Sequence, residues 1–556
     1  MTGTTHEVTP QPPLLVGHDV LATDAALLEA VRRYGGAGAV ECVTPLGVLA
    51  GTEQAQRWGV EANANPPTLR THDRYGHRVD EVDFHPSWHA LLDVATSHGL
   101  HGTAWQDSAP SPHVRRAAGF MVWSQVEAGH GCPVSMTYAA VPALRADPAL
   151  SAEFEPGLAA TSYDARLSSP ATKSGLLAGM AMTEKQGGSD VRANTTRAER
   201  LSVDGEWALT GHKWFCSAPM CDLFLVLAQA PAGLTCFVVP RVLADGTRNT
   251  FRIQRLKDKL GNRSNASAEI ELHRTWARQL GDEGRGVPTI IEMVSMTRLD
   301  CVLGSTALMR AAVAQATHHA AHRSAFGSLL ADKALMRAVL ADLAIESEAA
   351  TVLAMRLAAS FDPPGGASGG VSGGAARDEA GERAFRRLAI AVGKYWVCKR
   401  TPAMVGEALE CLGGNGYVEE SGLPRLYREA PLNSIWEGSG NVNALDVLRA
   451  LTREPASVEA FFAEVSLASG ADARLDAAVD RCREALVEAD EAGARRLVES
   501  LALVLQGSLL VRYAPAAVAD AFCATRLDGD WGHAFGTLPP GLDPASIVAR
   551  ATPRLP

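Results

Sequence analysis

The spacing of apolar residues predicts helices over most of the first 180 positions. Apolar side chains recur three and four positions apart around Leu27, and the pair Gly35-Gly36 predicts a stop. Helical spacing continues through residues 87–180. We therefore expect an N-terminal arm and helical domain over residues 1–179.

The pattern changes at Met180, where β-prone runs replace the helical spacing. Residues 223–227 and 235–239 are two such runs, and short turns separate them from their neighbours. We expect a small antiparallel β domain over residues 180–278.

Helical spacing returns after Gly286. Long helices are predicted over residues 287–320 and 382–412, with a Gly- and Ser-rich loop over residues 363–374 between them. We expect a helical bundle domain over residues 279–450.

The end of the chain adds a further helical segment. Leu497, Leu501, Val504 and Leu505 share one face of a predicted helix in this Ala-rich tail, over residues 451–556. The predicted fold class is α+β, mainly α. It comprises an N-terminal helical domain, a middle antiparallel β domain, a helical bundle and an additional C-terminal helical domain.

Composition and charge exclude several classes of protein. The net charge of −10 argues against binding polyanions by bulk electrostatics, although local basic patches can persist. Ten cysteines are scattered singly without a CxxC pair, which favours free thiols in a reducing compartment. The first residues lack the basic and apolar segments of a signal peptide, and no apolar run reaches about 18 residues. We expect a cytoplasmic protein.

Histidine pairs and serine motifs predict no separate site. His85 and His89 lie four positions apart, and a second group surrounds His318, but neither has a carboxylate or thiol nearby in sequence. Packing is the favoured interpretation, and no metal site is expected. GxSxG matches at Ser368 and Ser372 lack the strand–turn–helix context of a nucleophile, so we attribute them to composition.

A single carboxylate, Glu437, stands on a short loop just ahead of a predicted helix. It follows Trp436 and precedes the turn Gly438-Ser439-Gly440. Loops held by a rigid scaffold often carry catalytic groups. The stretch by itself leaves two alternatives open, a catalytic carboxylate and a solvated side chain in a capping loop.

Five segments, in order along the chain, resemble signatures of the acyl-CoA dehydrogenase family. They are residues 180–190 (MAMTEKQGGSD), 211–217 (GHKWFCS), 323–327 (RSAFG), 412–417 (LGGNGY) and the loop around Glu437. The resemblance covers residues 80–450. It implies the fold of that family, an FAD cofactor and oxidoreductase activity.

Three segments are similar to one branch of this family, the AidB-like flavoproteins of the bacterial adaptive response to DNA alkylation. They are residues 183–191, 256–267 and 433–441, and the additional C-terminal domain fits the same branch. This resemblance implies a homotetramer that protects DNA and retains weak acyl-CoA dehydrogenase activity. The alternatives are an active acyl-CoA dehydrogenase that passes electrons to an electron-transfer flavoprotein, without a DNA role, and a flavoprotein whose cofactor only stabilises the fold.

The signature residues suit a flavin ring and its phosphates. Met180, Met182 and Phe215 supply polarisable or aromatic surface, and Thr183 and Ser217 supply hydroxyls. The resemblance implies that the following residues bind the cofactor: Met180, Met182, Thr183, Ser189, Phe215, Cys216, Ser217, Arg323, Phe326, Gly413, Gly414, Trp436, Ser439 and Asn441. In the family the arginine at position 323 usually comes from a neighbouring subunit.

The resemblance makes Glu437 the general base that takes the α-proton of an acyl-CoA thioester while the flavin accepts a hydride. A carboxylate in a water-poor pocket has a raised pKa, which suits this task. Branched-chain relatives place their base at the position of Thr297, which cannot serve. Trp436 replaces a smaller aromatic residue, so we expect a narrow substrate cavity.

The branch resemblance also points to double-stranded DNA as a partner of the tail domain. Residues 450–556 contain ten Arg, no Lys and fifteen acidic residues, whereas DNA binding needs clustered cations. The candidate DNA contacts are Arg481, Arg483, Arg495, Arg496 and Arg512. A solvated face of mixed charge is the alternative.

Overall fold

The computed structural model describes residue 5 and residues 11–203, 205–363 and 378–555. The chain forms two compact units, each assembled from segments distant in sequence. The sheet unit comprises residues 54–304 and 435–442, and the helix unit comprises residues 1–53, 305–434 and 443–556. The four predicted domains remain a prediction, since these units group the chain differently. Ser368 and Ser372, with most of the predicted Gly- and Ser-rich loop, lie outside the described residues.

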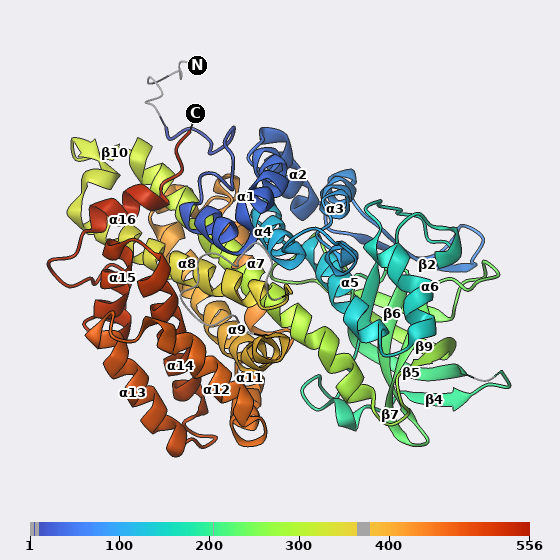
Figure 1. Ribbon diagram of the computed structural model, residues 1–556. Helices are drawn as coiled ribbons and strands as arrows, with labels where there is room; N and C mark the ends of the chain where they lie inside the picture. Colours follow the sequence, from blue (N-terminus) through green and yellow to red (C-terminus); the bar gives the residue numbers. More distant parts are fainter. Residues whose placement is uncertain (1–4, 6–10, 204, 364–377, 556) are drawn as a thin grey trace. The chain divides into compact units, whose positions relative to one another are not determined.

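A β-sheet organises the sheet unit (Figure 1). Its described strands are β3 (Ala178–Ala181), β4 (Arg197–Arg200), β5 (Glu206–Ser217), β6 (Leu223–Ala230), β7 (Gly233–Pro240), β8 (Phe251–Leu256) and β9 (Ser267–Leu280). β5 pairs with β4 and β9, β9 with β7, β7 with β6, and β6 with β4, so the ring of strands closes. Closure leaves few unpaired edges and encloses a core that includes Trp207, Phe224 and Phe237.

The sheet region departs from the sequence prediction in two places. The predicted antiparallel domain contains two parallel pairs, because β3 and β4 each run alongside β6 in the same direction. A hairpin of β1 (Thr68–His72) and β2 (Arg78–Asp83) lies in the predicted helical domain, in a stretch for which no element was predicted. Its turn is stabilised by the Asp73 side chain, which accepts hydrogen bonds from the backbone of Tyr75 and His77 at 2.8 and 2.9 Å.

Most helices of the sheet unit come from the N-terminal part of the chain. They are α2 (Glu53–Ala64), α3 (Pro86–Ser97), α4 (Pro112–Ser124), α5 (Gly131–Leu144), α6 (Pro148–Ala159) and the first half of α7 (Gly286–His322). α5 packs against β3. Arg116 on α4 forms a buried ion pair with Asp300 on α7, in which Nη2 lies 2.7 Å from Oδ2.

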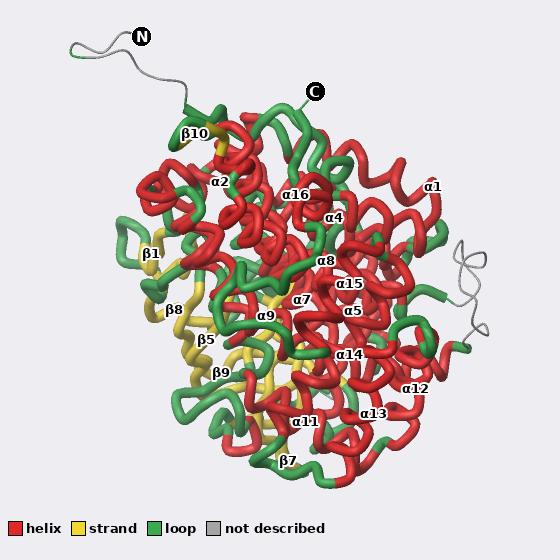
Figure 2. The backbone as a smooth tube through the Cα atoms, turned by 90° about the vertical axis from the view of Figure 1, so that its left-hand side faces the viewer, coloured by secondary structure: helices red, strands yellow, loops and turns green. Residues whose placement is uncertain are grey.

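The helix unit is built around α8 (Ala334–Ala359), α9 (Glu379–Glu410) and α14 (Ala494–Tyr513), which pack against one another (Figure 2). Its other helices and strands are α1 (Ala25–Ala50), α10 (Leu423–Glu429), α11 (Gly440–Arg453), α12 (Pro455–Val465), α13 (Ala473–Val487), α15 (Ala516–Phe522), α16 (Pro544–Ala551), β10 (Ser324–Ala325) and β11 (Ser328–Leu329). The buried face predicted for the tail helix is confirmed, because Leu497, Leu501, Val504 and Leu505 are all buried. No helix within the described ranges is long and apolar enough to cross a membrane.

The predicted long helices are confirmed by α7 and α9, and the predicted stop at Gly35-Gly36 is only a kink. Gly36 has φ +72°, which interrupts the helical geometry, but the helix resumes and continues to Ala50. Glycine adopts this left-handed conformation at little cost, so the chain can change direction without ending the helix.

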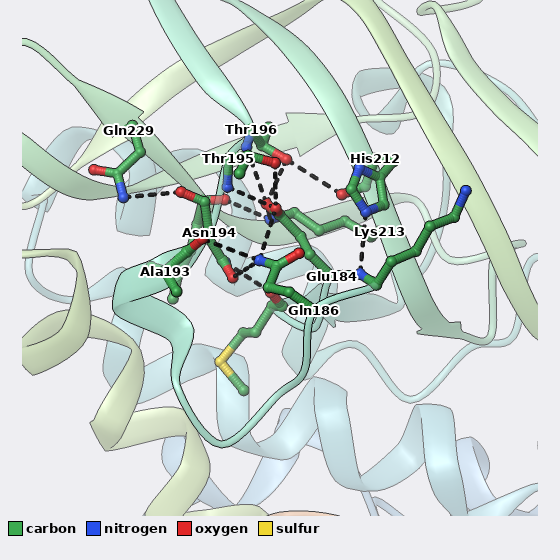
Figure 3. Close-up of polar contacts among 12 residues, drawn as sticks. Glu184, Gln186, Ala193, Asn194, Thr195, Thr196, His212, Lys213 and Gln229 are labelled. Atoms are coloured by element: carbon green, nitrogen blue, oxygen red, sulfur yellow. Dashed lines mark hydrogen bonds and ion pairs between the residues drawn. The ribbon is translucent and has the colours of Figure 1, made fainter.

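A buried ion pair joins the loop after β3 to strand β5 (Figure 3). Lys213 donates from Nζ to Glu184 at 2.9 Å, and neither side chain is exposed. Thr195 and Thr196 donate to the same carboxylate through both backbone N–H and hydroxyl groups, at 2.6 to 3.1 Å. Burial by itself would raise the pKa of Glu184, but Lys213 and these donors hold it well below its usual range.

We expect Glu184→Gln to lower the free energy of unfolding by about 3–5 kcal/mol, because Lys213 would be left as an unpaired buried charge. Urea denaturation of the purified protein measures this loss. Glu199→Gln is the matched control, since Glu199 pairs with Arg274 where both side chains are mostly exposed. Its cost should stay below about 1 kcal/mol. Equal costs for the two variants would contradict the role given to the buried pair.

Candidate functional site

Glu437 occupies an unusual backbone conformation in the loop before α11. Its φ is +58°, and the next residue, Gly438, has φ +96°. A residue with a side chain rarely adopts left-handed geometry, because it costs of order 1–3 kcal/mol unless the surroundings enforce it. The loop therefore directs this carboxylate at the expense of local stability.

Two residues of α7 hold Glu437 in place. The Thr297 hydroxyl donates to Oε2 at 2.6 Å, and Nε of Arg298 donates to the backbone carbonyl of Glu437 at 3.0 Å. Thr297, considered in the sequence as the position of a rival base, is instead a hydrogen-bond donor to the carboxylate. A hydrogen bond to a charged acceptor contributes about 1.5–3 kcal/mol, enough to offset much of the strain in the loop.

The two predicted flavin signatures of the sheet unit lie side by side. The backbone N–H of Trp214 on β5 donates to the carbonyl of Thr183 at 2.8 Å, which joins β5 to the loop after β3. Along β5 the side chains alternate, so Phe215 is about half exposed and Cys216 is buried. Met180 is buried at the end of β3, whereas Ser189 is exposed in the loop.

The Cys132 thiol lies near both Glu437 and the end of strand β5. Cys132 lies near the start of α5, where its thiol contacts the Ser217 hydroxyl and the Asn265 amide. Burial and, to a smaller extent, the negative charge of Glu437 raise the pKa of this thiol to about 12, although Lys259 and the two contacts act in the opposite direction. Two segments 220 positions apart in sequence thus contribute to one site.

The residues of the sheet unit fit a flat ring with a phosphate tail. Phe215 offers an exposed ring face, with the Lys257 ammonium group 4.4 Å from its centroid. Gly187 has φ +137°, and a Cβ on Gly188 would lie 2.6 Å from the Thr183 hydroxyl. The loop after β3 therefore needs glycine for its close turn, as a backbone that approaches a ligand does.

The remaining predicted cofactor residues are divided between the units. Trp436 is half-buried in the sheet unit, next to Glu437, and Ser439 and Asn441 are exposed there. The helix unit contains four others, Arg323, Phe326, Gly413 and Gly414. Phe326 is 99% exposed at the turn of the β10–β11 hairpin. Neither unit taken by itself brings all these residues together.

The candidate DNA-contacting arginines differ in how far internal contacts occupy them. Arg512 forms an ion pair with the buried Glu464 at 2.5 Å, and Arg481 donates to the carbonyl of Leu527 at 2.7 Å. Arg483 lies 3.4 Å from the Ser466 hydroxyl, and Arg495 donates to the Tyr395 hydroxyl at 3.1 Å. Arg496 is exposed beside Arg495 at the start of α14.

A second carboxylate, Glu127, was not identified from the sequence. It is buried between α4 and α5, where the Ser264 hydroxyl donates to it at 2.7 Å and the backbone N–H of His130 at 3.1 Å. Burial by itself would raise the pKa of Glu127, but the contacts with His130 and Ser264 lower it to about 2. The spacing of Glu127 and His130 was the available signal, although Ser264 lies 137 positions away.

No group of three or more His, Cys, Asp or Glu side chains in the described part of the chain could hold a metal ion. His85 caps the start of α3, where its ring accepts from the backbone N–H of Ser87. His89 contacts the Tyr163 hydroxyl at 2.7 Å, and His318 contacts the carbonyl of Pro13 at 2.8 Å. These histidines have structural partners.

Three family profiles match the chain in order. The Adaptive response protein AidB N-terminal domain matches residues 10–165. The middle and C-terminal domains of acyl-CoA dehydrogenase match residues 179–275 and 284–452.

Similar proteins extend over nearly the whole chain. The putative acyl-CoA dehydrogenase AidB of Escherichia coli (strain K12) is 45% identical over 526 residues, covering 94% of this chain and 95% of that protein. The crystal structure of Caenorhabditis elegans ACDH-11 in complex with C11-CoA has a TM-score of 0.83 at 27% identity, covering 94% of this chain and 93% of that one. A glutaryl-CoA dehydrogenase from Mycobacterium smegmatis in complex with FADH2 has a TM-score of 0.58 at 20% identity. It covers 77% of this chain and 98% of its own, and shows the fold alone.

We expect the Glu127 network to make the protein sensitive to acid. Its pKa lies near 2 in the folded chain and near 4.5 ordinarily, so its contribution is present above pH 4.5 and is lost as the pH falls toward 2. The full loss corresponds to about 3 kcal/mol. Urea denaturation between pH 5 and pH 3 should therefore give a shallower pH dependence for Glu127→Gln than for the wild type. Parallel pH dependences would contradict this assignment, and Glu199→Gln serves as the exposed control.

Proposed function

The chain belongs to the acyl-CoA dehydrogenase family, in its AidB-like branch, and from this premise we propose that it is an FAD-dependent oxidoreductase acting on an acyl-CoA thioester. The observation that carries the proposal is the placement of Glu437. Its carboxylate is held by Thr297 in a strained loop, and its charge acts on the Cys132 thiol, which also contacts the Ser217 hydroxyl at the end of β5.

FAD is the cofactor we propose for the sheet unit. Phe215 and Met180 would form the bed of the ring, with the hydroxyls of Thr183 and Ser217 as donors and the loop at Gly187 and Gly188 near the phosphates. The family signatures and the fit of these residues support this assignment. When bound, FAD supplies the acceptor for the hydride that leaves the β-carbon.

The residues of this chain would prepare the substrate for that step. Glu437 removes the proton from the α-carbon and holds it on its carboxyl group. The hydrogen bonds from Thr297 and Arg298 orient the base, so little reorganisation accompanies the transfer. Trp436 and the buried α4–α5 turn exclude water from the carbanion that develops.

We also propose that the protein protects double-stranded DNA during the response to alkylation, as its branch suggests. The similarity to AidB over nearly the full length and the exposed pair Arg495-Arg496 favour this second role. The acidic tail means that binding would depend on a local cluster of arginines. We further propose that the protein assembles as a homotetramer and that an electron-transfer flavoprotein accepts its electrons.

Anaerobic titration with a panel of acyl-CoA thioesters tests the enzymatic role. We expect bleaching of the flavin absorbance, and we expect Glu437→Gln to slow it at least about 100-fold because general-base catalysis is lost. FAD content should be unchanged in this variant, and Glu199→Gln should react like the wild type. Bleaching of Glu437→Gln at the wild-type rate would reject Glu437 as the base.

Retardation of a double-stranded DNA fragment at increasing salt tests the DNA role. Arg495→Ala with Arg496→Ala should weaken binding and reduce the slope of log K against log salt by about two, since each phosphate contact contributes about 0.9. Arg383→Ala with Arg453→Ala removes two other exposed charges of the helix unit and is the control. Absence of retardation by the wild type at low salt would refute the DNA role.

A further inference from the structure

The Asn265 side-chain amide, in the loop between β8 and β9, is buried with little to satisfy it. The residue is 2% exposed. Among the described residues the Cys132 thiol contacts the amide, but neither Oδ1 nor Nδ2 forms a hydrogen bond of ordinary geometry. Buried amides are almost always paired, because an unpaired one loses the hydrogen bonds that water would supply. Such a group marks a place where a polar partner belongs.

Contacts on both sides hold the backbone around Asn265. Its N–H donates to the carbonyl of Asn262 at 3.2 Å, and its carbonyl accepts from Nζ of Lys259 at 2.5 Å. The α4–α5 turn presses on the same loop, since a Cβ on Gly129 would lie 1.9 Å from the Ser264 hydroxyl. The backbone that carries the buried amide is therefore held in place.

Asn265 lies near the end of strand β5 and near the Cys132 thiol, which is also near Glu437. Ser217 pairs with Ser267 across β5 and β9, and the N–H of Ala218 donates to the carbonyl of Ala266 at 2.8 Å. Cys132, which neighbours Ser217 and Glu437, also neighbours the amide of Asn265. Asn265 and Glu437 thus both lie near the Cys132 thiol.

The chemistry of the amide limits what can satisfy it. Oδ1 needs a donor and Nδ2 needs an acceptor. A saturated acyl chain provides neither, and a thioester carbonyl provides only an acceptor. A hydroxyl or amide group provides both.

We propose that Asn265 is a specificity-determining residue that binds a hydroxyl or amide group on the acyl chain of the substrate. The proposal rests on the acyl-CoA function proposed above and defines its substrate class as acyl thioesters with a polar group close to the reacting carbons. Glu127 and Ser264, which lie beside Asn265 along the loop and the α4–α5 turn, add to the polarity of this wall.

Binding of two thioesters of nearly equal length tests the proposal. 4-Hydroxybutyryl-CoA and pentanoyl-CoA differ by a hydroxyl in place of a terminal methyl group. Calorimetric titration of FAD-loaded Glu437→Gln protein measures their affinities without turnover. We expect the hydroxylated thioester to bind about tenfold more tightly, and Asn265→Leu in the same background to abolish this preference. Gln254→Leu, an exposed amide on β8, is the matched control and should retain it.

Each other outcome overturns the proposal in a distinct way. If the Glu437→Gln protein binds the two thioesters with equal affinity, the acyl-CoA function is retained and the role of Asn265 is rejected. Binding of neither thioester would reject both. A preference that survives Asn265→Leu, together with weakened FAD retention, would assign the amide to the flavin ring. If Asn265→Leu does not fold, Asn265→Ser replaces it, and the preference of the parent protein remains a test in itself.

Discussion

The buried pair of Glu184 and Lys213 is the constraint on which the site depends. Glu184 belongs to one flavin signature, and Lys213 immediately precedes the aromatic residues of the other. A charge with no exposure to water must be neutralised where it stands, so the loop after β3 has one place relative to β5. Four hydrogen bonds from Thr195 and Thr196 satisfy the oxygens of the Glu184 carboxylate and hold it in one position.

The loop that carries Glu437 is held by a second set of contacts, which come from α7. Glu437 can adopt a left-handed backbone conformation because hydrogen bonds from Thr297 and Arg298 on α7 offset its cost in free energy. A strained backbone conformation persists only when surrounding contacts stabilise it, and the same contacts hold the side chain in one orientation. Glu437 and the two flavin signatures are therefore positioned by separate interactions, and Cys132 lies near both Glu437 and Ser217.

Two buried polar side chains lie close together in the sheet unit. Glu127, in the α4–α5 turn, has a lowered pKa, and Asn265, next to the Ser264 that donates to Glu127, has an amide without a hydrogen bond of ordinary geometry. Each polar group buried beside a hydrocarbon chain would weaken binding of that chain. Membership in the family thus defines the type of reaction, whereas the proposed choice of substrate rests on these buried groups.

The sequence by itself determined the order of helical and β-rich regions, the long helices α7 and α9, the family, and the identity of the signature residues. These follow from local periodicity and from short contiguous motifs, which need no knowledge of contacts. The β1–β2 hairpin was missed because it lies within a mostly helical region, and the kink at Gly36 was taken for an end because a stop and a bend share one residue type. Only the tertiary structure decided that Thr297 supports Glu437 rather than replacing it, and that Glu127, Ser264, Cys132 and Asn265 surround the site. Thr297 and Glu437 lie 140 positions apart, and burial, which gives each contact its strength, is a property of the folded chain alone.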